Sequence, residues 1–192
     1  MRFSEAMQTV TRHGDHWQAA VSEDWLQGRS AFGGLQAALA LRAMREQVPV
    51  GMPLRSLQAT FIAPVPAGNV TIRAQRLREG RSAIQVEASL CDGAQTLCRL
   101  VGVFGSARPS ALHIQPVQPP VASAAVQEVA YVEGRMPAFT QHFRARWLRG
   151  DLPFSGGHQR DNVLQLSLHD EGPVDETHVL AFADFIPPIA LS

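Results

Sequence analysis

A nearly continuous hydrophobic segment early in the chain is the strongest feature of its polarity pattern. From Leu35 to Met44 only Gln36 and Arg42 are polar, whereas a helix on a protein surface has a broad polar face behind its apolar stripe. The segment continues to about Val48, which gives a helix roughly 24 Å long, too short and too rich in alanine to span a membrane. We therefore expect a helix that is covered on nearly all sides inside a soluble fold.

Strict alternation of apolar and polar residues predicts strands after this helix. Three segments, residues 69–78, 82–91 and 95–104, show the period of two that is typical of a sheet with one dry face. The pairs Glu79-Gly80 and Asp92-Gly93 separate them, and Asp-Gly is among the strongest hairpin signals. The pattern predicts an antiparallel meander of three strands.

Two further strands are expected beside the helix, at residues 16–21 before it and 54–63 after it. Tight hairpin turns leave no room for the helices that a parallel sheet needs between its strands. The simplest way to bury the helix is then to curl an antiparallel sheet around it. The sequence predicts an α+β protein with the hot dog arrangement, an antiparallel sheet wrapped around a central helix.

The composition changes after residue 105, and the same plan then begins again. Residues 106–135 carry several prolines among Ala, Ser, Val and Gln, which is typical of a linker. Strand-like segments at 139–149 and 163–169 precede a helical region at 175–192. We therefore expect a first hot dog unit at 1–105, a linker at 106–135, and at 136–192 the beginning of a second unit, cut short within its central helix. The uncovered apolar surface of that helix would need another chain or a longer parent protein.

Charge, cysteine content and the N-terminal residues narrow the expected partners. Lys plus Arg and Asp plus Glu number 17 each, so net charge favours neither nucleic acid nor an anionic membrane. Cys91 and Cys98 form no metal-ligand pattern, and we expect reduced thiols rather than a disulfide. The N-terminus lacks the apolar region of a signal peptide. A cytoplasmic enzyme or binding protein, with no metal and no cofactor, is the expectation.

Two places along the chain could carry chemistry. Gly33 and Gly34 at the start of the buried helix could offer backbone N–H groups to a substrate oxygen, or could be small only to allow close packing. Asp184 is the one charged residue between 179 and 191, and carboxylates are rarely buried without a partner or a purpose. It could act as a general base or cap a helix that begins at Pro187-Pro188.

Basic and imidazole side chains are weaker candidates. Arg73, Arg76, Arg78 and Arg81 surround a predicted hairpin and could hold phosphates, although a solvated strand face is the favoured explanation. The histidines, among them His142 and His158, have no metal-ligand spacing. The chain contains no Gly-x-Ser-x-Gly elbow, phosphate-binding loop or dinucleotide fingerprint.

Several motifs in order along the chain resemble those of the thioesterase-like superfamily of double hot dog proteins, related to acyl-CoA thioesterase II. They cover most of the chain. They are Phe32-Gly33-Gly34 before the Ala-rich helix, residues 57–64, residues 77–82, residues 139–143 and 152–156, and Ala183-Asp184 with Pro187-Pro188.

This resemblance implies an acyl-CoA thioesterase that works without a metal. Asp184 matches the family's catalytic aspartate, which would activate a water, while the family's Thr or Ser and Gln would come from strands beyond Ser192. The expected substrate-binding residues are Phe32, Gly33, Gly34, Arg78 and Arg81. The expected partners are an acyl-CoA substrate and other copies of the chain in a homo-oligomer, with no nucleic acid and no membrane. The alternative is a non-catalytic acyl-CoA binding or assembly module; hydration of an enoyl thioester lacks a convincing acid and base pair.

Overall fold

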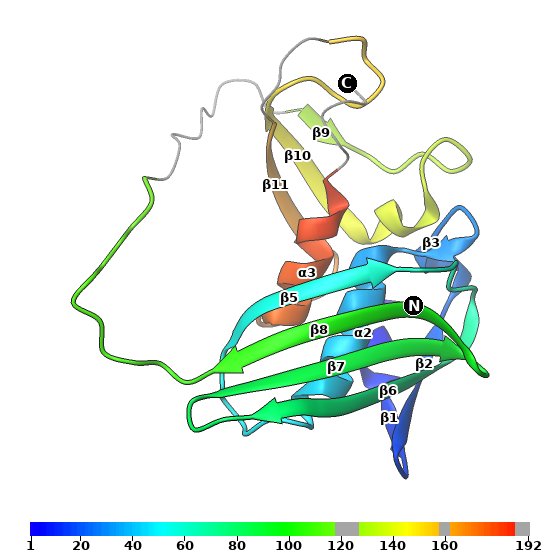
Figure 1. The fold of residues 1–192 in the computed structure, drawn as a ribbon. Coiled ribbons are helices and arrows are strands. Elements are labelled where there is room, and N and C mark those ends of the chain that lie inside the picture. The colour runs from blue at the N-terminus through cyan, green and yellow to red at the C-terminus, as the bar shows by residue number, and fades with distance from the viewer. Residues whose placement is uncertain (118–126, 158–161, 187–192) are drawn as a thin grey trace.

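A six-stranded antiparallel sheet curls around one helix in the first half of the chain (Figure 1). The computed structural model describes residues 1–117, 127–157 and 162–186. The sheet has the order β1-β2-β6-β7-β8-β5. Its strands are β1 (Thr11–His13), β2 (His16–Val21), β5 (Leu54–Phe61), β6 (Gly68–Glu79), β7 (Ala83–Asp92) and β8 (Gln95–Gly105). The predicted α+β hot dog architecture is confirmed.

Helix α2 (Gly33–Arg45) is the centre of this sheet, as its polarity pattern predicts. Of its 13 residues, 11 are buried, and only Arg42 and Arg45 are not. The helix ends three residues before the expected Val48, because the chain turns at residues 46–47 ahead of Pro49. No helix among the described residues is both long enough and apolar enough to cross a bilayer.

Short elements lie ahead of the sheet and between β2 and α2. They are α1 (Phe3–Gln8), the 3₁₀ helix η1 (Glu23–Trp25), and the two-residue strands β3 (Leu26–Gln27) and β4 (Ser30–Ala31). Residues 1–14 show no strong helical or strand periodicity. The side chains of Phe3 and Trp25 are nonetheless fully buried, which fixes this segment against the core.

The second half of the chain forms a smaller sheet and a second helix. The sheet has the order β11-β10-β9, with β9 (Gln127–Val129), β10 (Phe143–Arg149) and β11 (Val163–Leu168). The 3₁₀ helix η2 (Ala138–His142) precedes β10, and α3 (Glu176–Phe185) follows β11. Strand β9 lies within the range expected to be a linker; its three residues are too few to show alternation. Within the expected helical region, residues 187–192 lie outside the described residues.

Helices α2 and α3 pack side by side in opposite directions. Near the start of α2, the Gly34 N–H donates to the carboxylate of Asp184 near the end of α3. At the other end, the Arg45 guanidinium pairs with the carboxylate of Glu176 in the first turn of α3. The two contacts establish the antiparallel arrangement and join the two halves of the chain.

A cluster of aromatic rings buries the junction between the two halves. Phe32 of the first half and Phe139 of the second stack face to face, with ring centroids 4.0 Å apart. Phe143 contacts both rings edge-on and also contacts Phe185 of α3. Aromatic contacts of this kind add to the stabilisation from burial alone.

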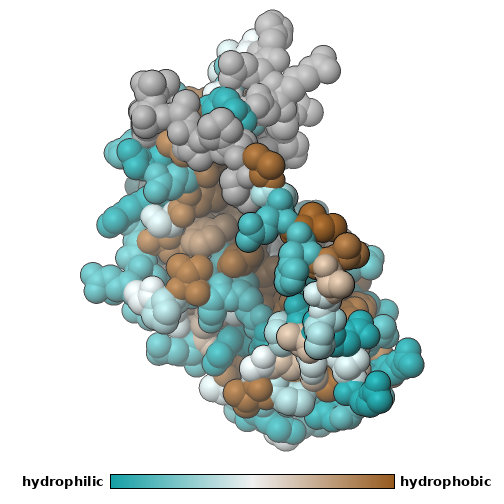
Figure 2. Space-filling view, turned by 90° about the vertical axis from the view of Figure 1, so that its left-hand side faces the viewer, coloured by the Kyte–Doolittle hydropathy of each residue, from teal (hydrophilic) through white to brown (hydrophobic). Residues whose placement is uncertain are grey.

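Apolar surface remains exposed beside this junction. Figure 2 shows hydrophobic residues gathered in a recess on the side of the molecule that faces left in Figure 1. On α3, the side of the helix away from α2 leaves Val179 57% exposed. The sequence predicts uncovered apolar surface on this helix, and α3 shows it.

Candidate active site

The contact between Asp184 and α2 brings together residues 150 positions apart. The Gly34 N–H donates to Asp184 Oδ2 with an N···O distance of 2.8 Å. Gly34 is the second residue of α2, where backbone N–H groups have no partner within the helix and point along the positive end of its dipole. The carboxylate therefore lies where a helix terminus favours negative charge.

The sequence left open whether Asp184 acts as a base or caps a helix that begins at Pro187-Pro188. Asp184 lies within the last turn of α3 rather than ahead of a helix. It caps the N-terminus of the neighbouring helix α2 instead of its own. The alternative helix start at Pro187-Pro188 lies outside the described residues.

A shallow hollow of about 350 Å³ opens beside the carboxylate. Its polar side chains are those of Gln27, Ser30, Gln36 and Asp184, and Gly33 lies beside them. Its apolar wall is the end of β5 and the segment that follows, where Phe61 and Ile62 are both about half exposed. The hollow thus combines a carboxylate, a helix N-terminus and an apolar wall, the features needed to hold a substrate with a polar reactive group and an apolar chain.

The surroundings of Asp184 tune its proton affinity. Partial burial disfavours the charged form and raises the pKa of the carboxyl above its ordinary value of 3.8, while the hydrogen bond from Gly34 acts in the opposite direction. A raised pKa makes a carboxylate a better proton acceptor than a solvated one, provided that it stays ionised at the working pH. Oδ2 is held by Gly34, and Oδ1 has no hydrogen-bond partner among the described residues.

Gly33 and Gly34 are small for different reasons. A Cβ on Gly34 would lie 2.8 Å from the Cα of Ala181 in α3 and 2.6 Å from a ring atom of Phe32. A Cβ on Gly33 would instead lie 2.8 Å from Asp184 Oδ2 and 2.7 Å from the Phe61 ring. Gly34 therefore allows the two helices to touch, and Gly33 keeps the space beside the carboxylate open.

Comparison with known proteins supports the hot dog fold described above. Residues 21–105 match the family model of the acyl-CoA thioesterase N-terminal domain. These residues form a hot dog domain of the thioesterase-like superfamily. Among curated proteins, none matches the chain.

Solved structures share the fold over nearly the whole chain. A hot dog protein of unknown function from Alicyclobacillus acidocaldarius is 22% identical, with a TM-score of 0.85 over 98% of this chain and 70% of its own. A candidate thioesterase II from Thermobifida fusca is 18% identical, with a TM-score of 0.74 over 98% of this chain and 73% of its own. An acyl-CoA thioesterase II from Mycobacterium marinum is 17% identical, with a TM-score of 0.67 over 94% of this chain and 64% of its own. These likenesses extend the shared fold to the second half of the chain.

Not all predicted substrate-binding residues of this thioesterase-like domain meet at the hollow. Phe32, the residue just before α2, is fully buried in the aromatic cluster and stacks on Phe139. Arg78 and Arg81 lie at the β6–β7 hairpin, at the opposite end of the sheet from Phe61 (Figure 1). Their contact with the phosphates of coenzyme A stays a prediction. Arg76 pairs with Glu79, as on a solvated strand face.

Gln36 is a buried polar residue of the hollow that the sequence did not single out for chemistry. Its side chain is 3% exposed, and Nε2 donates to the backbone oxygen of Ala31 at 2.6 Å. Its Oε1 is buried without a partner among the described residues. The signal in the sequence is a polar side chain on an otherwise apolar helix.

The remaining candidates are placed elsewhere in the domain. His142 stacks on Trp25 with ring centroids 4.1 Å apart, and burial lowers its pKa. His158 lies outside the described residues. Cys91 and Cys98 are free and buried, and burial raises the pKa of Cys98 to about 12. In the part of the chain that the structure describes, no three metal-ligating side chains are grouped to hold an ion.

Proposed function

We propose that the protein hydrolyses acyl-CoA thioesters to a free acid and coenzyme A, without a metal, through a water molecule activated by Asp184. The observation that carries the proposal is the Asp184 carboxylate held against the N-terminus of α2 in a hollow with an apolar wall. The match of residues 21–105 to the acyl-CoA thioesterase N-terminal domain supports the substrate class.

In the proposed reaction, Asp184 acts as the base and the N-terminus of α2 stabilises negative charge. Asp184 Oδ1 removes a proton from water as the water oxygen bonds to the carbonyl carbon. The tetrahedral intermediate carries its negative charge on the former carbonyl oxygen, beside the N-terminus of α2. A backbone N–H donor there is worth about 3 kcal/mol of transition-state stabilisation. The intermediate then expels the thiolate of coenzyme A, which takes up the proton.

Gly33 is the better candidate for this donor. The Gly34 N–H is already occupied by Asp184. Gly33 lines the hollow, and its N–H, the first of the helix, has no acceptor among the described residues. In this arrangement Gly34 orients the base and Gly33 polarises the thioester, while Phe61 and Ile62 contact the acyl chain.

Replacement of Asp184 tests the proposal. Asp184→Asn keeps an acceptor for the Gly34 N–H but removes the base, so hydrolysis should fall by about 10²- to 10⁴-fold while the unfolding midpoint is retained. The measurement is thiol release from acyl-CoA substrates of several chain lengths. Asp15→Asn is the matched control, because Asp15 is fully exposed in the β1–β2 turn, at the sheet edge opposite β5.

The second candidate function is an acyl-CoA binding module in which Asp184 only joins the helices. The hydrogen bond that already occupies the Gly34 N–H favours it. Equal thiol release by the wild-type protein and Asp184→Asn would reject the catalytic role. Acyl-CoA binding by a wild-type protein that releases no thiol would establish the binding module instead.

A further inference from the structure

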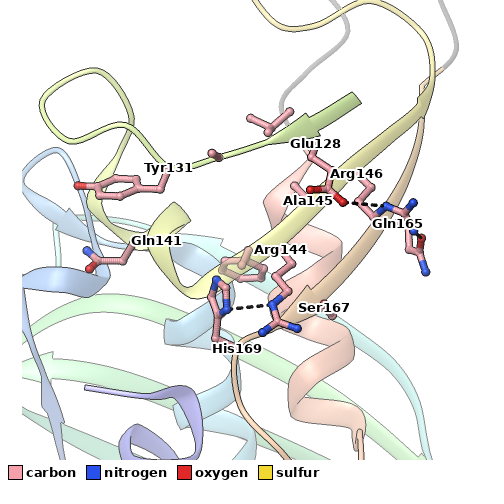
Figure 3. A pocket seen from close by; sticks show the side chains of 12 residues that line it. Glu128, Tyr131, Gln141, Arg144, Ala145, Arg146, Gln165, Ser167 and His169 are labelled. Carbon is pink, nitrogen blue, oxygen red and sulfur yellow. Dashed lines mark hydrogen bonds and ion pairs between the residues drawn. The ribbon is translucent and has the colours of Figure 1, made fainter. Parts of the chain in front are cut away.

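A second hollow, of about 420 Å³, lies on the outer face of the three-stranded sheet (Figure 3). Along β10, Phe143, Ala145 and Trp147 are buried toward the core, so the alternating Arg144 and Arg146 project to the opposite, exposed face. None of the residues that line this hollow lines the hollow beside Asp184. It is therefore a separate place on the molecule.

The arginine nearer the middle of β10 is compensated by its neighbours. Arg146 Nη1 donates to Gln165 Oε1 at 2.9 Å, and Arg146 Nε lies 3.5 Å from a carboxylate oxygen of Glu128. Figure 3 shows these three side chains together at one end of the hollow. The positive charge of Arg146 is thus paired within the protein.

The other arginine has a neutral partner. Arg144 Nε donates to His169 Nδ1 at 3.1 Å, as the dashed line in Figure 3 shows. Arginine can only donate, so Nδ1 of His169 is the acceptor and the ring carries its proton on Nε2. The contact orients the guanidinium without neutralising it. Among the described residues, no carboxylate lies within ion-pair distance of Arg144.

Hydrogen-bond donors dominate the surroundings of Arg144. The guanidinium retains its two terminal nitrogens, His169 retains Nε2–H, and Ser167, directly opposite Arg144 on β11, adds a hydroxyl. Tyr131 also lines the hollow, with its hydroxyl turned away from Arg144 (Figure 3). A planar guanidinium beside hydroxyl and imidazole donors is complementary to the oxygens of a phosphate or a carboxylate.

We propose that this hollow binds a small molecule through an oxyanion group, a phosphate or a carboxylate, centred on Arg144. Inorganic phosphate and citrate are the probes: the first tests for a phosphate group and the second for a carboxylate group. Titration of the full chain at low ionic strength, followed by backbone amide chemical shifts, locates the response. Shifts at residues 144, 167 and 169 that saturate with phosphate, with citrate or with both support the proposal.

Arg144→Gln should weaken binding at least about tenfold, because the amide keeps polarity but loses the charge and the fork of donors. Arg99→Gln is the matched control: Arg99 is also an exposed strand arginine and lies near a carboxylate, that of Glu87, at 3.9 Å. The control should bind as the wild type does. Both variants are checked for an unchanged unfolding midpoint, since both side chains are exposed.

Glu128→Gln should have the opposite effect on binding to that of Arg144→Gln. Removal of the carboxylate of the hollow frees the charge of Arg146 and should tighten binding about threefold or more, an effect that salt reduces. A variant that merely loosened the sheet would weaken binding instead. No saturable shifts with either probe, or equal affinities of Arg144→Gln and the wild type, would overturn the proposal. These tests do not measure thiol release. Failure of the oxyanion-binding proposal would therefore leave the proposed thioester hydrolysis unaffected.

Discussion

At the scale of single residues, two adjacent glycines that are indistinguishable in the sequence have different surroundings. The position of a Cβ on Gly34 is blocked by the backbone of Ala181, which cannot move unless the helices separate. On Gly33 it is blocked by the Asp184 carboxylate and by the ring of Phe61, which is 52% exposed and free to turn. Close packing therefore explains Gly34, and access to the carboxylate explains Gly33.

Alanine at each glycine should separate the two effects. Gly34→Ala overpacks a buried contact and should lower the free energy of unfolding by about 1–3 kcal/mol. Gly33→Ala should change that free energy little, because alanine also favours helix, yet displace Asp184 and lower the rate of thiol release. Urea unfolding and thiol release measure the two quantities. The same loss of stability in both variants would contradict the distinction.

At the scale of elements, the strands were predictable and the contact that forms the site was not. Residues 16–21 are β2 to the residue, and the three alternating segments match β6, β7 and β8 within two residues at each end. Alternation is a local property that one buried face imposes. The Gly34–Asp184 contact joins two helices far apart in sequence, and no local pattern encodes which side of α3 meets α2.

The start of α3 depends on a charged cap. The Asp175 side chain accepts from the N–H of Thr177 at 2.9 Å and from the Thr177 hydroxyl at 2.6 Å. Partial burial acts to raise the pKa of Asp175, but these bonds and those from His178 prevail and lower it to about 2. The ionised carboxylate is therefore stabilised in the folded state.

Asp175→Ala should lower the free energy of unfolding by about 1 kcal/mol through loss of the cap. The folded pKa of about 2 lies below the ordinary value of 3.8, so the contribution is present above pH 4 and disappears as the pH falls toward 2. Asp175→Asn keeps a capping oxygen that does not titrate, so it should retain most of the stability and lose this part of its pH dependence. Urea unfolding at several pH values tests both; identical pH profiles for Asn and wild type would refute the charged cap.

At the scale of the whole molecule, the buried aromatic cluster packs the two halves against each other, and we expect them to unfold as a single cooperative unit. Phe139 of the second half is 4% exposed and stacks on the fully buried Phe32 of the first. The sequence predicted two units with a linker between them, but composition does not reveal how two such units pack. Self-association through the exposed side of α3 stays a prediction.

Phe139→Ala should therefore destabilise both halves together, by about 3–5 kcal/mol. Trp17 reports on the first half, Trp147 on the second and Trp25 on their junction, where it stacks on His142. Tryptophan fluorescence and far-UV circular dichroism should therefore give one coincident transition at a lower denaturant concentration. Phe154→Ala is the control, since Phe154 is 82% exposed and should leave the midpoint unchanged. Two separate transitions in the wild-type protein would show that the halves unfold independently.

The ion pair of Arg45 and Glu176 has a consequence at the far end of the helix pair. Together with the Gly34–Asp184 bond it fastens α3 to α2 at both extremities. A slide of α3 by one helical turn, about 5.4 Å, would break both attachments at once. The distance between the Asp184 carboxylate and the backbone amides of α2 is therefore set by how the two helices pack, and not by a loop. The proposed site is thus preorganised before a substrate binds.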